Sequence, residues 1–285
     1  MASDPAQQAR DLTVVVVGGG PTGVAISGSI SEMARRTLPA DFRNVDLRRA
    51  RLVLVESGPR LLPAFSEEHS AYAKRALERD GIEVRLGIPV TRVDAAGVTV
   101  GNERIEAATV LWCTGVQGVP LARTLDAETK ANGRIVVGDD LSIPGHPECF
   151  VVGDAAYVAG PDGRAIPGFA SIAQREGRYV GEVIAARLRN EPAPAPFDRS
   201  MPSKVATITR HYGVAEWGDR SITGFIAWLM WGLLHLKSLS GGHSKLAIIA
   251  NWLRLLATYR RSARVIIDPA STMTMPANAT GTEPI

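Results

Sequence analysis

The feature that most constrains the fold is an apolar run that leads directly into a glycine-rich turn near the start of the chain. Residues 12–23, LTVVVVGGGPTG, give a strand followed by the spacing Gly18-x-Gly20-x-x-Gly23. In a strand–turn–helix unit the first glycine allows the tight turn, the second lets the backbone approach a pyrophosphate, and the third lets the helix pack on the strand. The small-residue segment 22–36 predicts that helix, whose free N–H groups favour negative charge. The pattern predicts a dinucleotide-binding unit, and the alternative is an ordinary strand-to-helix turn.

A second apolar strand, ending in an acid, indicates which nucleotide fits. Residues 51–56, RLVLVE, end in Glu56, where a carboxylate can accept hydrogen bonds from the adenosine ribose hydroxyls. The sequence therefore favours NAD over NADP. The separation from Gly23 exceeds the usual spacing of about twenty residues, and we interpret the polar segment 37–50 as a loop insertion. Two alternatives stay open, namely Glu56 as a solvated strand-end charge and a 2′-phosphate held by the arginines within 48–51.

Composition bounds the class of protein. With 285 residues, 45% of them hydrophobic and 21% charged, the chain can bury a substantial core, and we expect two lobes. A net charge of +3 without a basic and aromatic recognition element argues against nucleic acid as a partner. Cys113 and Cys149 lack CxxC spacing and are predicted to be buried core thiols, so neither a redox disulfide nor a metal site is indicated. The polar N-terminal segment gives no sign of a secretory signal.

The pattern up to residue 115 describes one nucleotide-binding lobe. Helical spacing of apolar residues predicts a helix over 67–79, which Asp80-Gly81 ends. Period-two alternation predicts a strand over 82–86, and residues 90–108 predict short antiparallel strands joined by turns. Residues 109–112, TVLW, predict a further buried strand.

A second ligand-binding signal follows. Residues 149–154, CFVVGD, predict a buried strand that ends in Gly153 and Asp154. Glycine there lets a ligand approach the backbone, and aspartate there can bind a ribityl or ribose hydroxyl. After Pro167 a helix is predicted over 169–188, and its N-terminus would present positive partial charge to a ligand at Asp154.

The last quarter of the chain differs in kind. Residues 192–202 read as a proline-rich linker and 205–217 as strand-like. The apolar run 222–236 is shorter than the about twenty residues that span a bilayer, and 246–259 places apolar residues on one helical face with tryptophan and arginine around it. We interpret 222–259 as a helix pair lying in a membrane surface. The alternative is a buried hydrophobic hairpin in a soluble dimer.

Five segments together resemble the two-dinucleotide-domain flavoproteins of the pyridine nucleotide-disulfide oxidoreductase superfamily, and among them the type II NADH:quinone oxidoreductases. They are VVVVGGGPTGV at 14–24, VLVESGPRLLPAF at 53–65, WCTGV at 112–116, SIPGHPECFVVGDAA at 142–156 and IAQREGRYVG at 172–181. The resemblance covers residues 10–267. It implies FAD and NADH as cofactors, and a respiratory reaction that passes a hydride from NADH to flavin and electrons on to a membrane quinone.

The resemblance also implies a set of site residues and no metal. The cofactor-binding set is Gly18, Gly19, Gly20, Pro21, Thr22, Gly23, Glu56, Thr114, Gly115, Gly153, Asp154 and Ala173. Of these, Gly18, Gly20, Gly23 and Glu56 would bind NADH, whereas Thr114, Gly115 and Asp154 would touch FAD. The helix after Pro167, with Arg175, would lie near the flavin or the quinone, and its dipole would stabilise negative charge on the isoalloxazine ring.

The chain departs from the family's pattern at three places. The family carries a strand–GxGxxG unit for the ADP part of FAD about a hundred or more residues before the NADH unit, and none precedes residue 14 here. Ala25 stands where the family has a glutamate near the nicotinamide, and Ser171 and Arg175 stand where it has glutamines facing quinone. Two hypotheses follow. The chain is an FAD-dependent NADH:quinone oxidoreductase, or a catalytically incompetent truncated or split module that binds NAD and membrane and needs a partner for FAD.

The predicted fold class is α/β, with a Rossmann-like nucleotide-binding domain, a partial FAD-binding domain and a C-terminal membrane-associated helical region. The expected domains are a 10–115 NADH-binding domain, a 116–190 C-terminal half of an FAD-binding domain, a 191–268 segment of linker, short strands and membrane-interface helices, and a 269–285 disordered tail. The expected location is the cytoplasmic face of the cell membrane, held peripherally. Besides quinone and the membrane surface, the expected partner is either a second copy of the chain or a chain that supplies the missing FAD half.

Overall fold

The computed structural model describes residues 4–39, 42, 45–118, 124–125, 127–130, 132–160, 163, 165–200, 203–238 and 242–258. The chain divides into two compact units, Met1–Ser238 and Leu239–Ile285. In the second unit the described element is helix α6 (Gly242–Thr258). The tail expected over 269–285 lies outside the described residues.

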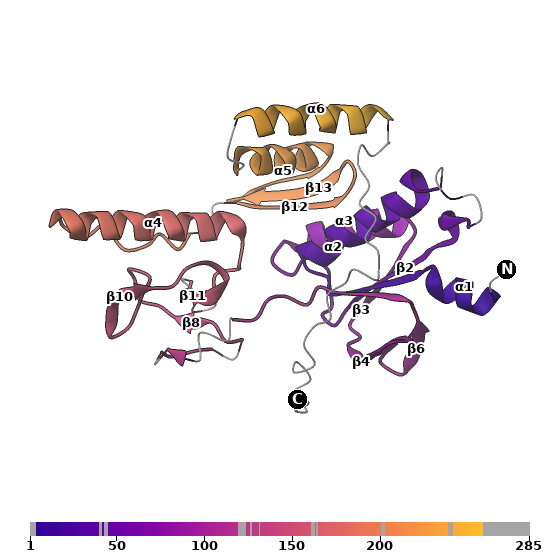
Figure 1. The fold of residues 1–285 in the computed structure, drawn as a ribbon, viewed down its shortest axis with the longest axis horizontal. Helices are drawn as coiled ribbons and strands as arrows, with labels where there is room; N and C mark the ends of the chain where they lie inside the picture. Colours follow the sequence, from indigo (N-terminus) through magenta and orange to yellow (C-terminus); the bar gives the residue numbers. More distant parts are fainter. Residues whose placement is uncertain are drawn as a thin grey trace, which may run out of the picture. The chain divides into compact units, whose positions relative to one another are not determined.

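A four-stranded parallel sheet organises the N-terminal part of the first unit (Figure 1). Its strands, in sheet order, are β3 (Ile82–Leu86), β2 (Arg51–Glu56), β1 (Thr13–Val17) and β7 (Thr109–Trp112). Their registers align Val17 with Val55 on one side and with Trp112 on the other, so β1, β2 and β7 end at the same edge. The Rossmann-like α/β fold expected for this region is therefore confirmed.

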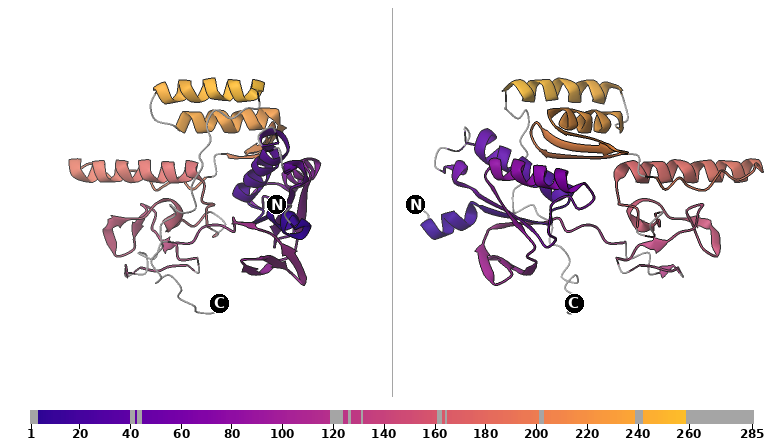
Figure 2. Two further views of the ribbon diagram at one scale, coloured as in Figure 1. Left: turned by 45° about the vertical axis from the view of Figure 1, so that its right-hand side comes forward. Right: turned by 180° about the vertical axis from the view of Figure 1, so that it is seen from behind.

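Both faces of this sheet are covered, which explains the unbroken valine runs. Side chains alternate along a strand, so Val16, Leu52 and Leu54 enter one core while Val15 and Val53 enter another. The first core lies under α2 (Pro21–Glu32) and α3 (Glu67–Arg79). The second lies under a small antiparallel sheet on the opposite face (Figure 2), made of β4 (Val90–Asp94), β5 (Gly97–Val100) and β6 (Glu103–Glu106). A strand buried on both faces reads as a continuous apolar run.

Local signals set the helix limits in this region. Ser66 caps α3 by accepting the His69 N–H, and Gly81, with φ of +75°, follows its last turn. The helix expected over 22–36 is α2, continued by a π-helical turn over Met33–Thr37. The remaining short elements are α1 (Pro5–Asp11) and a 3-10 turn, η2 (Leu47–Arg49).

One burial prediction for this region is wrong. Residues 109–112 form the expected strand, but Trp112 is 59% exposed and Thr109 is exposed as well. The reason is that, among the described strands, β7 lies at the sheet edge and pairs with β1 alone.

The segment between residues 127 and 198 has its own apolar cores. It contains β8 (Ile135–Val136), β9 (Ser142–Ile143), β10 (His146–Phe150), η4 (Gly153–Ala155), β11 (Ala156–Tyr157) and α4 (Ala170–Arg189). Leu141, Ala156, Ile172 and Phe197 meet in one core. The helix expected over 169–188 is confirmed as α4. The prediction of a buried strand over 149–154 is wrong. Strand β10 ends at Phe150 and is largely exposed, and a 3-10 turn begins at Gly153.

An antiparallel sheet of β12 (Lys204–Thr209), β13 (Tyr212–Trp217) and β14 (Arg220–Gly224) packs on the N-terminal helices. Ile208 and Val214 belong to the core beneath α2 and α3. At Gly28 of α2 a Cβ would lie 2.0 Å from the Ile208 carbonyl oxygen, so only glycine permits this approach. The apolar run 222–236 does not begin as a helix, because residues 222–224 complete β14 and α5 spans Phe225–Ser238.

A buried ionic cluster ties this sheet to α3. Glu216 of β13 accepts hydrogen bonds from the Ser66 N–H at 2.7 Å and interacts with His69 Nδ1 at 2.5 Å, while Lys204 Nζ lies 2.7 Å from its other oxygen. Burial by itself would raise the pKa of Glu216, but the hydrogen bonds from Lys204, Ser66 and His69 outweigh it and hold the pKa at about 2. The carboxylate is therefore charged and paired at all ordinary pH values.

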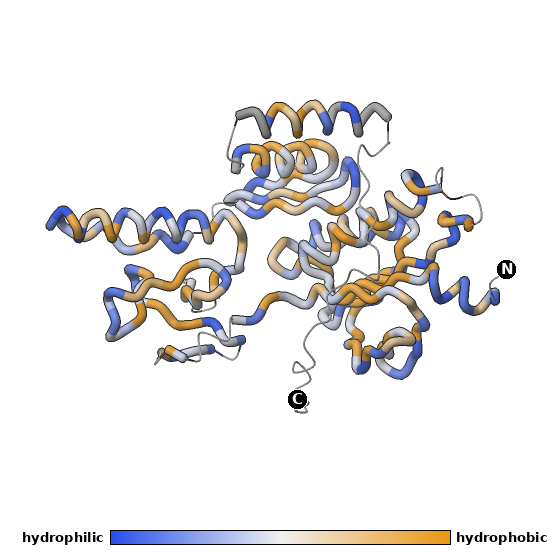
Figure 3. Tube along the Cα trace, viewed as in Figure 1, coloured by the Kyte–Doolittle hydropathy of each residue, from blue (hydrophilic) through white to orange (hydrophobic). Residues whose placement is uncertain are grey.

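Helix α5 carries apolar side chains at the surface. It is largely apolar along its length (Figure 3), and Phe225, Ile226, Leu229 and Leu233 are each at least 41% exposed. Leu229 follows Ile226 by three residues and Phe225 by four, and Leu233 follows Leu229 by four, so these residues share one helical face. Among the described residues, no helix is both long enough and apolar enough to cross a membrane.

Candidate nucleotide-binding site

The turn between β1 and α2 requires its glycines for three different reasons. Gly18 has φ of +111°, and a Cβ there would lie 2.4 Å from the Cys113 carbonyl oxygen. A Cβ on Gly23 would lie 1.8 Å from the carbonyl oxygen of Gly18, so α2 could not approach the turn. A Cβ on Gly20 would meet nothing within 4 Å, which leaves the backbone open to a ligand. The roles expected for Gly18 and Gly23 are those that the geometry assigns, whereas the approach of a pyrophosphate to Gly20 stays a prediction.

A pocket of about 460 Å³ opens at this turn. It lies at the carboxyl ends of β1, β2 and β7, and the chain departs in opposite directions on the two sides of β1. Such a switch point is where open α/β sheets bind ligands. The lining residues are Val17, Gly18, Gly20, Pro21, Thr22, Val55, Glu56, Ser57, Pro63, Pro89, Val90, Trp112, Cys113, Thr114 and Gly115.

Glu56 fixes the charge of this pocket. Its Oε2 accepts the Gly19 N–H at 2.5 Å, and its Oε1 accepts the Gly58 N–H at 2.6 Å. No lysine or arginine belongs to the described lining. Arg51, which the sequence left as a candidate for a 2′-phosphate, donates two hydrogen bonds to Glu83 at 2.8 and 2.9 Å. The pocket therefore offers a carboxylate, backbone N–H groups and an uncapped helix N-terminus.

Most of the predicted site residues near the glycine turn meet at this pocket. Gly18, Gly20, Pro21, Thr22 and Glu56 line it. Gly19 and Gly23 support the turn from behind, through the Glu56 carboxylate and through the contact with Gly18. Thr114 and Gly115, expected to touch FAD, line the same pocket from the end of β7, and their contact with FAD stays a prediction.

The other predicted residues gather at a second, separate cluster. Gly153 has φ of +66° and its backbone lies against Ala173 of α4, where a Cβ would be 3.5 Å from the Ala173 Cβ. The Asp154 side chain is 57% exposed, and its Oδ1 lies 3.7 Å from the Arg134 guanidinium. Helix α4 begins without a side-chain cap. The cluster thus combines an accessible carboxylate, a glycine turn and the N-terminus of a twenty-residue helix.

Two residues of this cluster, Glu176 and Arg134, were not predicted from the sequence. Glu176 is 3% exposed and accepts the Gly153 N–H at 2.5 Å. Burial raises its pKa, and the Gly153 N–H and the Arg134 charge oppose that rise only in part. The pattern that could have identified Glu176 is its position four residues after Ile172, on the apolar face of α4. Arg134 follows a turn glycine and carries no pattern, yet its Nε is buried without a hydrogen-bond partner.

Arg175 does not extend freely into either site. Its guanidinium donates to the Asp198 side chain at 2.8 Å, to the Asp198 carbonyl at 2.7 Å and to the Ser200 carbonyl at 2.9 Å, and it stacks over the Phe197 ring. These contacts hold the segment after α4 against the helix. A role for Arg175 toward flavin or quinone stays a prediction.

The cysteines are less buried than expected. Cys113 and Cys149 are free and only half-buried. Cys113 lies at the end of β7 in the pocket wall, and burial raises the pKa of its thiol. A thiol with a raised pKa holds little nucleophilic thiolate.

Comparison with known proteins agrees with this geometry. The family model for pyridine nucleotide-disulphide oxidoreductases matches residues 2–177. The type II NADH:quinone oxidoreductase Ndh of Mycobacterium tuberculosis is 38% identical over 278 residues, covering 94% of this chain and 59% of that protein. NdhA of the same organism is 37% identical over 265 residues, covering 88% and 55%. The chain thus spans little more than half the length of these curated relatives.

A solved structure has the same fold. NDH2 from Plasmodium falciparum, in complex with NADH, matches with a TM-score of 0.81 at 15% identity, over 92% of this chain and 69% of that one. At this identity the likeness is one of fold.

Proposed function

The chain belongs to the pyridine nucleotide-disulphide oxidoreductase family, and we propose that it is an FAD-dependent NADH:quinone oxidoreductase, passing a hydride from NADH to flavin and electrons on to a membrane quinone. The single observation that carries the proposal is the pocket lined by both the open backbone of Gly20 and Glu56. Identity of 37–38% with type II NADH:quinone oxidoreductases supports the reaction class.

In this proposal NADH binds across the glycine turn. The pyrophosphate lies at Gly20 and the uncapped N-terminus of α2, where backbone N–H groups and the helix dipole stabilise negative charge. Glu56 accepts hydrogen bonds from the ribose hydroxyls, and the absence of a cationic side chain from the described lining disfavours a 2′-phosphate. NADH is therefore the preferred nucleotide.

We assign the riboflavin-facing half of FAD to the second cluster. Asp154 offers an exposed acceptor to a ribityl hydroxyl, and the buried Nε of Arg134 is a donor that still lacks an acceptor. The N-terminus of α4 faces the same small cavity, lined also by Gly153 and Ala173, and would stabilise negative charge. Bound there, FAD would supply the two-electron chemistry between NADH and quinone. Glu176 holds the Gly153 turn in place for it.

We further propose peripheral attachment to the cytoplasmic face of the membrane through 222–259. The exposed apolar side chains of α5 support this. In this proposal quinone is drawn from the bilayer, residues 10–115 and 116–190 act as the NADH and FAD domains, and a second copy of the chain or a chain with a further FAD-binding half is the protein partner.

The test is a titration of the 285-residue chain with NADH and NADPH, followed by protein fluorescence. We expect NADH to bind more tightly, and replacement of Glu56 by alanine to remove the difference. Equal or tighter binding of NADPH by the unaltered chain would contradict the nucleotide assignment.

A second measurement tests the electron acceptor. The chain, supplied with FAD, is assayed for NADH oxidation coupled to reduction of a short-chain quinone. Turnover that is lost when Asp154 is changed to alanine supports the full reaction. NADH binding without turnover would restrict the function of the chain to nucleotide binding.

A further inference from the structure

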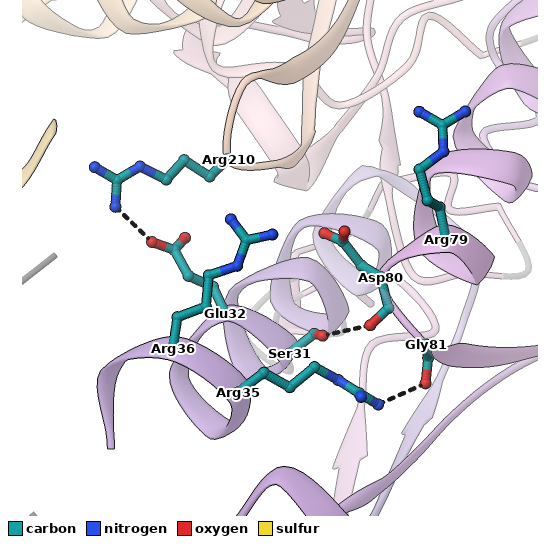
Figure 4. Close-up of a pocket in the computed structure, with 8 residues that line it drawn as sticks. All are labelled: Ser31, Glu32, Arg35, Arg36, Arg79, Asp80, Gly81 and Arg210. Atoms are coloured by element: carbon teal, nitrogen blue, oxygen red, sulfur yellow. Dashed lines mark hydrogen bonds and ion pairs between the residues drawn. The ribbon is translucent and has the colours of Figure 1, made fainter. Parts of the chain in front are cut away.

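An arginine-lined pocket of about 180 Å³ lies apart from both sites described above (Figure 4). It is formed where the end of α2 with its π-helical turn Met33–Thr37, the end of α3 and the β12–β13 turn meet. The lining residues are Ser31, Glu32, Arg35, Arg36, Arg79, Asp80, Gly81 and Arg210, and none of them lines the nucleotide pocket. The pocket lies wholly within the first unit of the chain.

The fold holds these elements together firmly. Ser31 of α2 donates to the Asp80 carbonyl at 2.8 Å, and Arg35 of the π-helical turn after α2 donates to the Gly81 carbonyl at 2.9 Å. These bonds join α2 and its π-helical turn to the end of α3. The close approach of Gly28 to β12 brings the β12–β13 turn beside α2. In that turn His211 has φ of +69°, a conformation that costs a non-glycine residue energy. Arg210 is thereby set against Glu32 at 2.8 Å.

The positive charge of the pocket is only partly neutralised. Four arginines and two acids line the pocket, and Arg210 forms an ion pair with Glu32. The Nε of Arg35 is buried without a hydrogen-bond partner. Arg79 donates to the Tyr212 hydroxyl, at 3.3 Å, and forms no ion pair among the described residues. Arg36 has neither an ion pair nor a hydrogen bond within the described part of the chain.

The pKa of the neighbouring His211 is affected by the same arginine charges. Burial is the main reason that the pKa of His211 is lowered, and the charges of Arg210 and Arg36 lower it further, against a smaller opposing effect of Glu32. A site with spare guanidinium donors and an excess of positive charge is suited to a phosphate, whose oxygens match the planar fork of N–H groups.

We propose that this pocket binds a phosphate group through Arg35, Arg36 and Arg79. Its surroundings favour a phospholipid headgroup as the source. The His211 ring lies against Phe225 and Trp228 of α5, with ring centres 5.6 and 5.5 Å apart, so the pocket adjoins the start of that helix. Phe225 and Ile226, at the start of α5, are 50% and 60% exposed. An anionic lipid could lay its phosphate in the pocket and its chains along these side chains.

The test has two arms and uses the full chain. In the first, inorganic phosphate is titrated calorimetrically at constant ionic strength into the unaltered chain, Arg36→Gln and Arg79→Gln. Each substitution should weaken binding about ten-fold, equivalent to about 1.4 kcal/mol. Arg178→Gln, which removes an exposed arginine of α4 outside the pocket, is the matched control and should bind as the unaltered chain does. NADH affinity should be the same in all four proteins.

In the second arm, the same proteins are sedimented with phosphatidylcholine vesicles, with and without phosphatidylglycerol. If the source is a lipid headgroup, phosphatidylglycerol raises the bound fraction of the unaltered chain and the control but not of Arg36→Gln and Arg79→Gln. If that increase is equal in all four while phosphate binding is weakened in the two variants, the source is a soluble phosphate. The proposal is wrong if Arg36→Gln and Arg79→Gln behave as Arg178→Gln in both arms.

Discussion

Replacing Gly20 by alanine should separate nucleotide binding from folding. Gly20 has φ of −71° and ψ of 179°, a conformation that alanine adopts without strain. A methyl group there contacts no protein atom within 4 Å and projects into open space at the glycine turn. Gly23 lies only three residues after Gly20, yet a methyl group there would lie 1.8 Å from the Gly18 carbonyl oxygen.

The expected magnitudes follow from these contacts. Alanine restricts the unfolded chain, which stabilises by about 0.4–1 kcal/mol, and it is a poorer helix N-cap than glycine, which costs an amount on the order of 1 kcal/mol. The free energy of unfolding should therefore change by less than about 1 kcal/mol. A methyl group that displaces the pyrophosphate from one backbone N–H forfeits a charge-assisted hydrogen bond of about 1.5–3 kcal/mol. The dissociation constant for NADH should rise roughly ten- to hundred-fold.

The assay pairs urea unfolding with NADH titration for each variant. Gly181→Ala, in α4 where a Cβ meets no atom within 4 Å, serves as the matched control and should keep full NADH affinity. Gly23→Ala should lose the folded state. If Gly20→Ala binds NADH as tightly as the unaltered chain, the pyrophosphate does not lie at this turn and the assignment of the pocket is refuted.

Three further outcomes are expected. Glu56→Ala should weaken NADH and narrow its advantage over NADPH in competitive titration, and an unchanged ratio would assign the selectivity elsewhere. The folded pKa of Glu216 is about 2, below its ordinary value of 4.5, so its contribution of about 3 kcal/mol to the free energy of unfolding should be complete above pH 4.5 and lost as the pH falls toward 2. Urea unfolding of Glu216→Gln and of the unaltered chain at pH 7 and pH 3 measures this contribution. Equal pH dependence of the two proteins would contradict it. Ile226→Asp with Leu229→Asp should reduce vesicle binding several-fold in sedimentation, whereas undiminished binding would show that α5 is not the membrane contact.

Where local chemistry decides a conformation, the sequence predicts it well. Residues 51–56, 67–79 and 82–86 have the predicted limits, because each follows from a short apolar pattern and from capping or turn residues beside it. The glycine turn is of the same kind, since the freedom of glycine and the spacing of the motif act within a few residues. Glu56 also falls where a strand-end acid should, beside the turn.

Burial and partners were less predictable. Trp112 reads as the end of a core strand, yet it is exposed because β7 is the edge strand of the sheet that the described residues form. The strand-like segment after residue 203 gives no sign that Ile208 would meet Gly28, almost two hundred residues earlier, or that Glu216 would pair with His69.

The sequence by itself determined the nucleotide-binding unit, because a glycine turn, a strand and a helix are fixed by steric and hydrogen-bonding rules that act over a few residues. Only the tertiary structure decided which distant groups share a cavity. It brings Thr114 to Gly20, buries Glu176 against Gly153, and gathers arginines from the π-helical turn after α2, from α3 and from the β12–β13 turn. Charge, desolvation and hydrogen-bond satisfaction depend on neighbours in space, and those neighbours come from chain segments that no local pattern connects.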